Sequence, residues 1–222
     1  MLRGLFITGT DTGVGKTVVA AACMHRYRST LPLRYWKPIQ TGIEEDDDTA
    51  AVRSLAECSA EEIWDRGARL RHPVSPHLAA RLSGQRIDIE KLVPLTAGNS
   101  ADLRWIVEGA GGVLVPINGS EMMTDLMERL GLPVLVVARS TLGTINHTLL
   151  TLETLRHRCL RIAGVVMVGE PNLENRKAIE QFGQTNVLGE LPLFSSLNAA
   201  ELGRWSRENL DPSGGLMDSF DA

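Results

Sequence analysis

The segment Phe6-Ile-Thr-Gly-Thr-Asp-Thr-Gly-Val-Gly-Lys-Thr17 joins a short apolar run to a glycine-rich loop, and a helical pattern follows over residues 17–28. Glycines allow the backbone to wrap so closely that successive N–H groups point at phosphate oxygens. Lys16 would reach the β- and γ-phosphates, and Thr17 would place its hydroxyl on Mg²⁺. The pattern therefore predicts a nucleoside triphosphate site that includes Thr12, Gly13, Val14, Gly15, Lys16 and Thr17.

One position of this loop departs from the usual pattern G-x-x-x-x-G-K-[ST]. Thr10 stands where the first glycine is expected, and Gly9 comes one residue earlier. The Gly-Lys-Thr core and its place between a strand and a helix are intact, which is the context that the motif requires. The alternative interpretation is an ordinary glycine-rich turn with a surface lysine.

Short apolar runs alternate with amphipathic stretches along the rest of the chain. The runs predict strands at residues 5–8, 34–36, 103–107, 134–138, 162–168 and 187–191. The stretches between them predict helices at residues 49–57, 76–82, 88–95, 122–130, 144–158 and 173–182. Strands that are apolar on both faces and separated by helices favour a parallel sheet covered on both sides. We therefore expect an α/β fold, a three-layer sandwich with a mostly parallel central sheet.

The length of 222 residues corresponds to one α/β domain or two small ones, at roughly 150 residues per domain. We expect a single domain over residues 1–210, with a helical insertion at about 43–101 that flanks the sheet and contains no strand. The segment 211–222 begins Asp-Pro-Ser-Gly-Gly and is polar and glycine-rich. Terminal segments of this composition are typically poorly ordered, and we expect the same here.

Composition excludes several classes of protein. Lys and Arg number 23 against 27 Asp and Glu, a net charge of −4, whereas nonspecific nucleic-acid binders are usually basic. Three widely spaced cysteines without a C-x-x-C pair disfavour a disulfide scaffold or a cysteine-rich zinc site. The start of the chain turns glycine-rich too early for a signal peptide, and no apolar run approaches the eighteen or so residues of a membrane span. We expect a cytoplasmic protein with no nucleic-acid or membrane partner.

Two acidic positions are candidates for the metal that accompanies a triphosphate. Glu108 follows the apolar run 103–107 and leads directly into Gly109-Ala-Gly-Gly112, whose glycines allow close approach of phosphate or substrate. Asp48 closes an acidic run and directly precedes a helical pattern. The alternatives are an exposed glutamate at a strand end and an ordinary solvated loop, which is what most charge runs are.

The residues resemble dethiobiotin synthetase over most of the chain. The stretches that carry the resemblance occur in the family's order and approximate spacing: FITGTDTGVGKT at 6–17, WKPIQTG at 36–42, VSPH at 74–77, VEGAGG at 107–112, LPVLVV at 132–137, LGTINHTLLT at 142–151 and LGELP at 188–192. A phosphate loop alone is generic. Its combination with Lys-Pro-x-x-Thr-Gly, Ser-Pro-His and Leu-Gly-x-x-Asn-His is specific.

The resemblance implies an ATP-dependent ligase of biotin synthesis that closes a ureido ring from 7,8-diaminopelargonate and CO2. A carbamate forms first, its oxygen attacks the γ-phosphate, and the second amine displaces phosphate from the mixed anhydride. Such phosphoryl transfer needs positioning and charge neutralisation more than covalent help from the protein. The resemblance also implies a homodimer with each active site at the subunit interface.

Roles for individual residues follow from the same resemblance. The catalytic residues would be Lys16, Lys37 and Thr12, with both lysines flanking the carbamate and the γ-phosphate. Thr17, Asp48 and Glu108 would hold Mg²⁺. The nucleotide would also be contacted by Gly109, Ala110, Gly111, Pro192 and Leu193, and the substrate by Thr41, Leu142, Gly143 and Asn146. Taken without that context, a lysine at a strand end such as Lys37 is usually solvent-facing, and Asn146 or Thr144 could simply cap a helix.

The sequence departs from the family just after the predicted strand 162–168. The family commonly has an asparagine there that reads the adenine edge, whereas this chain has Val168 and Gly169. An amide offers a paired donor and acceptor to a base, and valine does not. We therefore expect loose base recognition, with other triphosphates such as CTP or GTP also accepted.

Two other classes share parts of this pattern. Partner-regulated P-loop ATPases that position plasmids or division proteins share the fold, but they carry an extra lysine near the start of the loop, where this chain has Gly9-Thr10-Asp11. Amidotransferase-type ligases that act on corrinoid carboxylates are longer and include a glutaminase domain, for which 222 residues leave no room.

Overall fold

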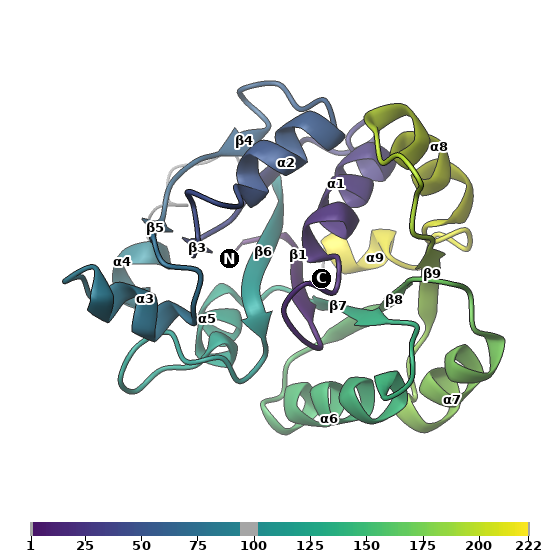
Figure 1. Cartoon of the computed structure of the whole chain (residues 1–222). Coiled ribbons are helices and arrows are strands. Elements are labelled where there is room, and N and C mark those ends of the chain that lie inside the picture. Colours follow the sequence, from purple (N-terminus) through teal and green to yellow (C-terminus); the bar gives the residue numbers. More distant parts are fainter. Residues whose placement is uncertain (1, 94–101, 222) are drawn as a thin grey trace.

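The computed structural model describes residues 2–93 and 102–221, and its centre is a seven-stranded sheet in the order β4-β2-β6-β1-β7-β8-β9 (Figure 1). Each recorded pairing between neighbouring strands of this sheet is parallel. The strands are β1 (Gly4–Gly9), β2 (Leu33–Trp36), β4 (Ile63–Trp64), β6 (Arg104–Gly112), β7 (Val134–Arg139), β8 (Ile162–Val168) and β9 (Val187–Leu191). A second sheet pairs β3 (Ile39–Gln40) with β5 (Ala68–Arg69).

Helices cover both faces of the large sheet, so the expected three-layer α/β sandwich is confirmed (Figure 1). One layer contains α1 (Lys16–Tyr27), α2 (Asp48–Leu55), α8 (Ala199–Asn209) and α9 (Met217–Phe220). The other contains α5 (Met123–Leu130), α6 (Thr144–His157) and α7 (Leu173–Gly183). The short helices α3 (Pro76–Leu82) and α4 (Ile89–Leu92) lie beside the small sheet.

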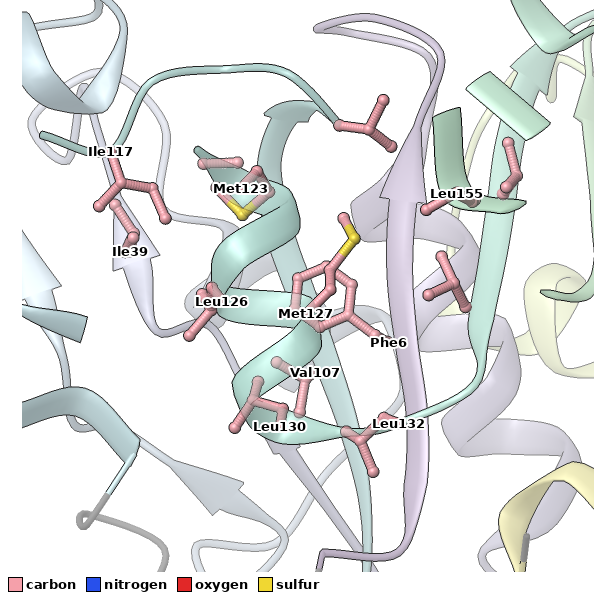
Figure 2. Packing of buried hydrophobic residues seen from close by; sticks show 14 of the residues in the cluster. Phe6, Ile39, Val107, Ile117, Met123, Leu126, Met127, Leu130, Leu132 and Leu155 are labelled. Carbon is pink, nitrogen blue, oxygen red and sulfur yellow. The ribbon is translucent and has the colours of Figure 1, made fainter. Parts of the chain in front are cut away.

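The apolar residues of β1 alternate between two cores, because successive strand side chains point to opposite faces. Leu5 and Ile7 are fully buried in the core beneath α1 and α8. Phe6 is fully buried in the other core, where Figure 2 shows it beside Val107 and the α5 residue Met127. This packing fixes β1 in the middle of the sheet and therefore fixes the position of the loop that follows it.

The six strands predicted from the apolar runs are all present, with β6 longer than expected. β6 continues to Gly112, so Glu108 lies inside the strand and is fully buried rather than exposed at its end. The predicted helices are also present, with ends that differ by at most three residues. The last two residues of the predicted helix 88–95 lie outside the described residues, as does part of the predicted insertion 43–101.

The insertion was expected to contain no strand, and that expectation is wrong. β4 extends the large sheet by pairing with β2, and β5 pairs with β3. Both strands have only two residues, too few for an alternating pattern to be visible, and their partners are distant in sequence. Helix α8 was also missed, although Asn198 caps it by accepting a hydrogen bond from the N–H of Glu201 (3.0 Å).

The C-terminal segment was expected to be poorly ordered, but its described part packs onto the α1 face of the sheet. Leu216 and Phe220 are fully buried, and the Phe220 ring lies 5.0 Å from the Tyr27 ring. The Tyr27 hydroxyl donates to Asp211 Oδ2 (2.9 Å), and the backbone N–H of Leu216 donates to the same oxygen (2.9 Å). Composition did not predict this ordered packing, because burial of two apolar side chains and one hydrogen-bonded carboxylate stabilises the segment more than its glycines destabilise it. A domain boundary near residue 210 stays a prediction.

Within the part of the chain that the structure describes, no helix is long and apolar enough to cross a membrane.

Candidate active site

A cavity of about 730 Å³ opens beside the phosphate loop and the N-terminus of α1. Ligands of α/β proteins typically bind at this place, outside the carboxyl ends of the parallel strands. Eleven of the residues predicted for the site line the cavity: Thr12, Gly13, Gly15, Lys16, Thr17, Lys37, Thr41, Asp48, Glu108, Ala110 and Gly111. The structure therefore brings together the phosphate loop, the segment after β2 and the end of β6.

At its last turn, the phosphate loop adopts a backbone conformation that only glycine accommodates without strain. Gly15 has φ +98° and serves as the N-cap of α1 without a side-chain cap. The space beside it is closed by Val168, whose Cγ1 lies 3.2 Å from where a Cβ would stand. The first turn of α1 contains no acidic residue, so the positive end of the helix is left for an anion.

Lys16 follows directly and is largely buried, at 7% exposure. Its ammonium donates to the backbone carbonyl of Asp11 (2.9 Å) and so folds back over the loop. Burial, and then the nearby charge of Lys37, lower the pKa of Lys16 to about 8. A triphosphate bound to the loop would favour the charged form of this side chain.

Glu108 lies at the centre of the polar cluster and is fully buried. Its Oε1 lies 2.8 Å from Lys37 Nζ and 3.0 Å from Thr17 Oγ1, and its Oε2 accepts from the Tyr35 hydroxyl (2.8 Å). Asp48, at the start of α2, lies 2.8 Å from Thr17 Oγ1 through Oδ1 and 2.6 Å from Lys37 Nζ through Oδ2. Two carboxylates from different elements thus share one lysine and one hydroxyl.

The charges in this cluster support one another. Burial disfavours the ammonium of Lys37, but the neighbouring Glu108 and Asp48 outweigh burial and raise its pKa above the usual value. Burial likewise disfavours the charged form of Asp48, yet Lys37 outweighs it and lowers the pKa of the carboxyl. For Tyr35, burial and then the charge of Glu108 raise the pKa well above its usual value, so its hydroxyl stays a donor.

The donor set of Thr17, Asp48 and Glu108 fits a magnesium ion that is held jointly with phosphate. Mg²⁺ prefers oxygen ligands and is usually bound through one or two carboxylates plus substrate phosphates. Thr17 Oγ1 lies within 3.0 Å of an oxygen of each carboxylate, so the three ligands already converge. Within the described ranges, no group of three or more His, Cys, Asp or Glu side chains gathers into an all-protein metal site.

Three residues near the site were not singled out from the sequence. Tyr35 orients Glu108, as described above. The Gln40 side-chain amide donates to the carbonyls of Thr41 (2.9 Å) and Asp46 (3.0 Å), which holds the acidic loop before α2. Arg139, at the end of β7, donates to the carbonyl of Thr12 (2.9 Å) from outside the phosphate loop. A polar or charged residue at or near the end of a buried strand was the signal available for all three.

Some of the predicted residues lie away from the cavity lining. Leu142 and Asn146 are exposed, and Leu142 projects fully into solvent before the start of α6. Gly143 caps α6 with φ +94°, and no side chain caps this helix. Pro192 and Leu193 follow β9, with Leu193 exposed. Roles for these residues in binding stay predictions.

The two positions noted in the sequence, Val168 at the end of β8 and Gly169 directly after it, offer no side-chain amide. Val168 packs against Gly15, as described above. Gly169 has φ +130°, which residues with a side chain rarely adopt, and a Cβ there would lie 2.3 Å from Ser140 Oγ, so a larger residue would strain the backbone and displace the Ser140 hydroxyl. The nearby Asn175 uses its amide to bond the carbonyl of Ser140 (2.9 Å).

A scan against protein families matches residues 3–201 to a family described as AAA domain. An ATP-dependent dethiobiotin synthetase BioD of Paramagnetospirillum magneticum is 50% identical over 201 residues, which cover 90% of this chain and 93% of that protein. A protein of the same name from Brucella ovis is 43% identical, covering 89% of this chain and 90% of its own.

Solved structures with low sequence identity share the fold. A ParA family ATPase from Chlorobium tepidum superposes with a TM-score of 0.51 at 11% identity, covering 92% of this chain and 98% of the other. A nucleotide-binding protein from Archaeoglobus fulgidus, solved with ADP, gives 0.54 at 13% identity, covering 99% and 92%. At such identities the likeness concerns the fold alone.

Proposed function

The chain belongs to the family of ATP-dependent dethiobiotin synthetases, and from this premise we propose how its residues carry out the reaction. It is an ATP-dependent ligase of biotin biosynthesis. The observation that carries the proposal is the cluster of Lys16, Thr17, Lys37, Asp48 and Glu108 at the wall of one cavity. The proposal extends to the substrates, the metal, the subunit arrangement and the role of each side chain.

We propose that the substrates are 7,8-diaminopelargonate, CO2 and ATP. One amine adds to CO2 and loses a proton, which gives a carbamate. A carbamate oxygen attacks the γ-phosphorus, and ADP leaves. The second amine then attacks the carbonyl carbon of the mixed anhydride, the C–O bond to phosphate breaks, and the ureido ring closes with release of inorganic phosphate and a proton.

Lys16 and Lys37 are the two cations that would stabilise the charge on the transferring phosphoryl group. Both are buried, at 7% and 3% exposure, where electrostatic stabilisation exceeds that in bulk water. Thr12 and Thr41 line the same cavity and offer hydroxyls to the amines or the carbamate. The backbone N–H groups of residues 12–17 and the segment 109–111 would hold the phosphates.

Thr17, Asp48 and Glu108 would hold Mg²⁺. When bound, the ion neutralises charge on the phosphate oxygens that it contacts. The support for this assignment is the chemistry of the three converging oxygen ligands, of which one belongs to the phosphate loop.

Substrate binding across two subunits is part of the same proposal. Leu142, Gly143 and Asn146 lie outside the cavity lining of their own chain, at the uncapped N-terminus of α6. A helix N-terminus favours a carboxylate. In a homodimer this end of α6 would bind the carboxylate of the substrate held in the partner's cavity. Pro192 and Leu193 would lie alongside the nucleotide base.

The test is product formation by the purified protein from 7,8-diaminopelargonate, bicarbonate, Mg²⁺ and ATP, read by mass spectrometry. We expect dethiobiotin, and we expect Lys37→Ala to abolish it with folding intact by circular dichroism. The exposed substitution Lys177→Ala is the matched control and should retain activity, since Lys177 lies on the surface and pairs there with Glu174. Nucleotide binding and hydrolysis without product would contradict the proposal and favour a partner-regulated ATPase.

A further inference from the structure

The Lys37 ammonium is fully engaged in the structure, and two of its three partners are carboxylate oxygens of the residues assigned to the metal. It lies 2.6 Å from Asp48 Oδ2 and 2.8 Å from Glu108 Oε1, and it donates to the carbonyl of Gly109 at 3.1 Å. An ammonium has three N–H donors. Each donor therefore has an acceptor in place, and none is left for a phosphate or carbamate oxygen.

The surroundings of Lys37 explain why this arrangement is stable. The side chain is 4% exposed and Glu108 is fully buried, so a carboxylate without a nearby cation would be costly. Removing the ammonium while nothing replaces it would leave two negative charges side by side. Lys37 can therefore leave its position only if another cation takes over both carboxylates.

We propose that Lys37 is an internal counter-ion that occupies the cation site between Asp48 and Glu108 and is released when a divalent cation binds to these two carboxylates. The inference rests on the proposed function, because that function supplies the metal-ligand assignment. Its consequence concerns timing: Lys37 becomes available to the transferring phosphoryl group only in the metal-loaded enzyme. The enzyme thereby couples metal loading to assembly of its catalytic cations.

Lys16 provides the control for this proposal. It is a second buried lysine in the same cavity, but it donates to the backbone carbonyl of Asp11 instead of to a carboxylate. Lys37→Met and Lys16→Met each remove one positive charge from the site with a side chain of similar length. Loss of either positive charge should raise metal affinity through general electrostatics, whereas direct competition for the same carboxylate oxygens adds to this effect only at Lys37.

The experiment measures Mn²⁺ binding to the protein without nucleotide, by electron paramagnetic resonance of the free ion. We expect Lys37→Met to bind Mn²⁺ about tenfold more tightly than wild type, or better, in the range typical of linked binding events. Lys16→Met should change the affinity by much less. Equal gains in both variants, or no gain in Lys37→Met, would overturn the exchange.

A further variant separates failure of the exchange from failure of the ligand assignment. Asp48→Asn should weaken Mn²⁺ binding strongly, because it removes one of the two carboxylates. If Asp48→Asn binds Mn²⁺ as wild type does, the assignment of the metal ligands is wrong. If it weakens binding but Lys37→Met does not strengthen it, the ligands are right and the exchange is wrong.

A measurement on the unmodified chain covers the case in which Lys37→Met does not fold. Reductive methylation followed by peptide mass spectrometry reports how accessible each lysine is. We expect Mg²⁺ to increase methylation of Lys37 and to leave that of Lys91 unchanged, since the Lys91 side chain is 85% exposed on α4, a helix that does not contribute to the cavity lining. Methylation of Lys37 that Mg²⁺ leaves constant would contradict its release.

Discussion

Glu108 shows how much a single buried carboxylate depends on its neighbours. It has no exposed surface, and its two oxygens are shared among Lys37, Thr17 and Tyr35. A buried ionised carboxylate is tolerated only when it is paired and hydrogen-bonded. The residues that pair with it are therefore as important for the site as the carboxylate itself.

Tyr35→Phe tests this dependence. The substitution removes the donor to Glu108 Oε2 (2.8 Å), and we expect turnover to fall by about tenfold, as is typical when a residue that orients a metal ligand is lost. Tyr27→Phe is the matched control, because it removes a hydroxyl from another buried carboxylate, Asp211, away from the cavity. Both variants should lose about 1–3 kcal/mol of stability. Equal turnover in the two variants would show that Tyr35 acts through stability alone.

The three cysteines differ in their expected reactivity toward a thiol reagent at pH 8. Burial raises the pKa of Cys23 to about 12 and that of Cys58 to about 11, so almost no thiolate forms at either position. Cys159 is exposed. We expect one fast-reacting thiol in the folded protein and three after unfolding, with the fast one lost in Cys159→Ser. Rapid reaction of Cys23 in the native protein would contradict its place in the core.

At the scale of elements, the C-terminal segment 211–221 packs against α1. Tyr27 of α1 donates to Asp211, and α9 places Phe220 against the Tyr27 ring. Arg104 at the start of β6 pairs with Asp221 near the end of the segment. These contacts join the first helix and the centre of the sheet to residues that composition assigns to a loose tail.

Phe220→Ala should therefore destabilise the fold. Truncating a buried phenylalanine to alanine typically lowers the free energy of unfolding by roughly 3 kcal/mol or more. The control is Phe182→Ala, since Phe182 is 65% exposed and such surface substitutions usually stay within about 0.5 kcal/mol. Urea denaturation of both variants measures the difference. Equal urea midpoints for the two variants would mean that packing of the C-terminal segment against α1 contributes nothing to stability.

The end of β8 and the phosphate loop together bear on the choice of nucleotide. Val168 packs against Gly15, and Gly169 has no side chain, so neither position supplies a side-chain amide to a base. We expect ATP to be preferred over CTP and GTP by less than about a hundredfold, equivalent to about 2.7 kcal/mol. A competition series with all three triphosphates measures the ratio. A larger preference would mean that other groups read the base.

At the scale of the whole molecule, the predicted site is divided between two regions. The phosphate loop, Lys37 and the carboxylates share one cavity, whereas Leu142, Gly143 and Asn146 lie outside its lining. A homodimer in which each cavity receives these residues from the partner would complete the site. The oligomeric state and the source of the residues can both be tested by mixing inactive variants.

Lys37→Ala and Asn146→Asp should each be inactive, the second because its carboxylate repels that of the substrate. In a hybrid dimer, the Asn146→Asp subunit supplies an intact Lys37 and the other subunit supplies an intact Asn146. If the site is shared, an equal mixture should recover about a quarter of wild-type activity, since half of the dimers have one intact site of two. No recovery after subunit exchange would place both residues in the same subunit's site.

Local sequence patterns were sufficient to predict the strand–loop–helix unit at residues 4–27, the six longer strands and most of the helices. These features depend on interactions among residues that are close in the chain. The glycine pattern sets the loop, and the periodicity of apolar residues sets each element. The same local patterns identified Lys16, Thr17, Asp48 and Glu108 as candidates for the site, and the family resemblance added Lys37.

The contacts among these candidate residues depend on how distant elements pack in the tertiary structure. Lys37 and Glu108 are 71 residues apart in sequence, Tyr35 and Glu108 are 73 apart, and Tyr27 and Asp211 are 184 apart. The two-residue strands β4 and β5 form because they pair with β2 and β3, which lie elsewhere in the chain. Because such contacts form only when distant elements pack, no local pattern encodes that Lys37 lies between the two carboxylates rather than in the open cavity.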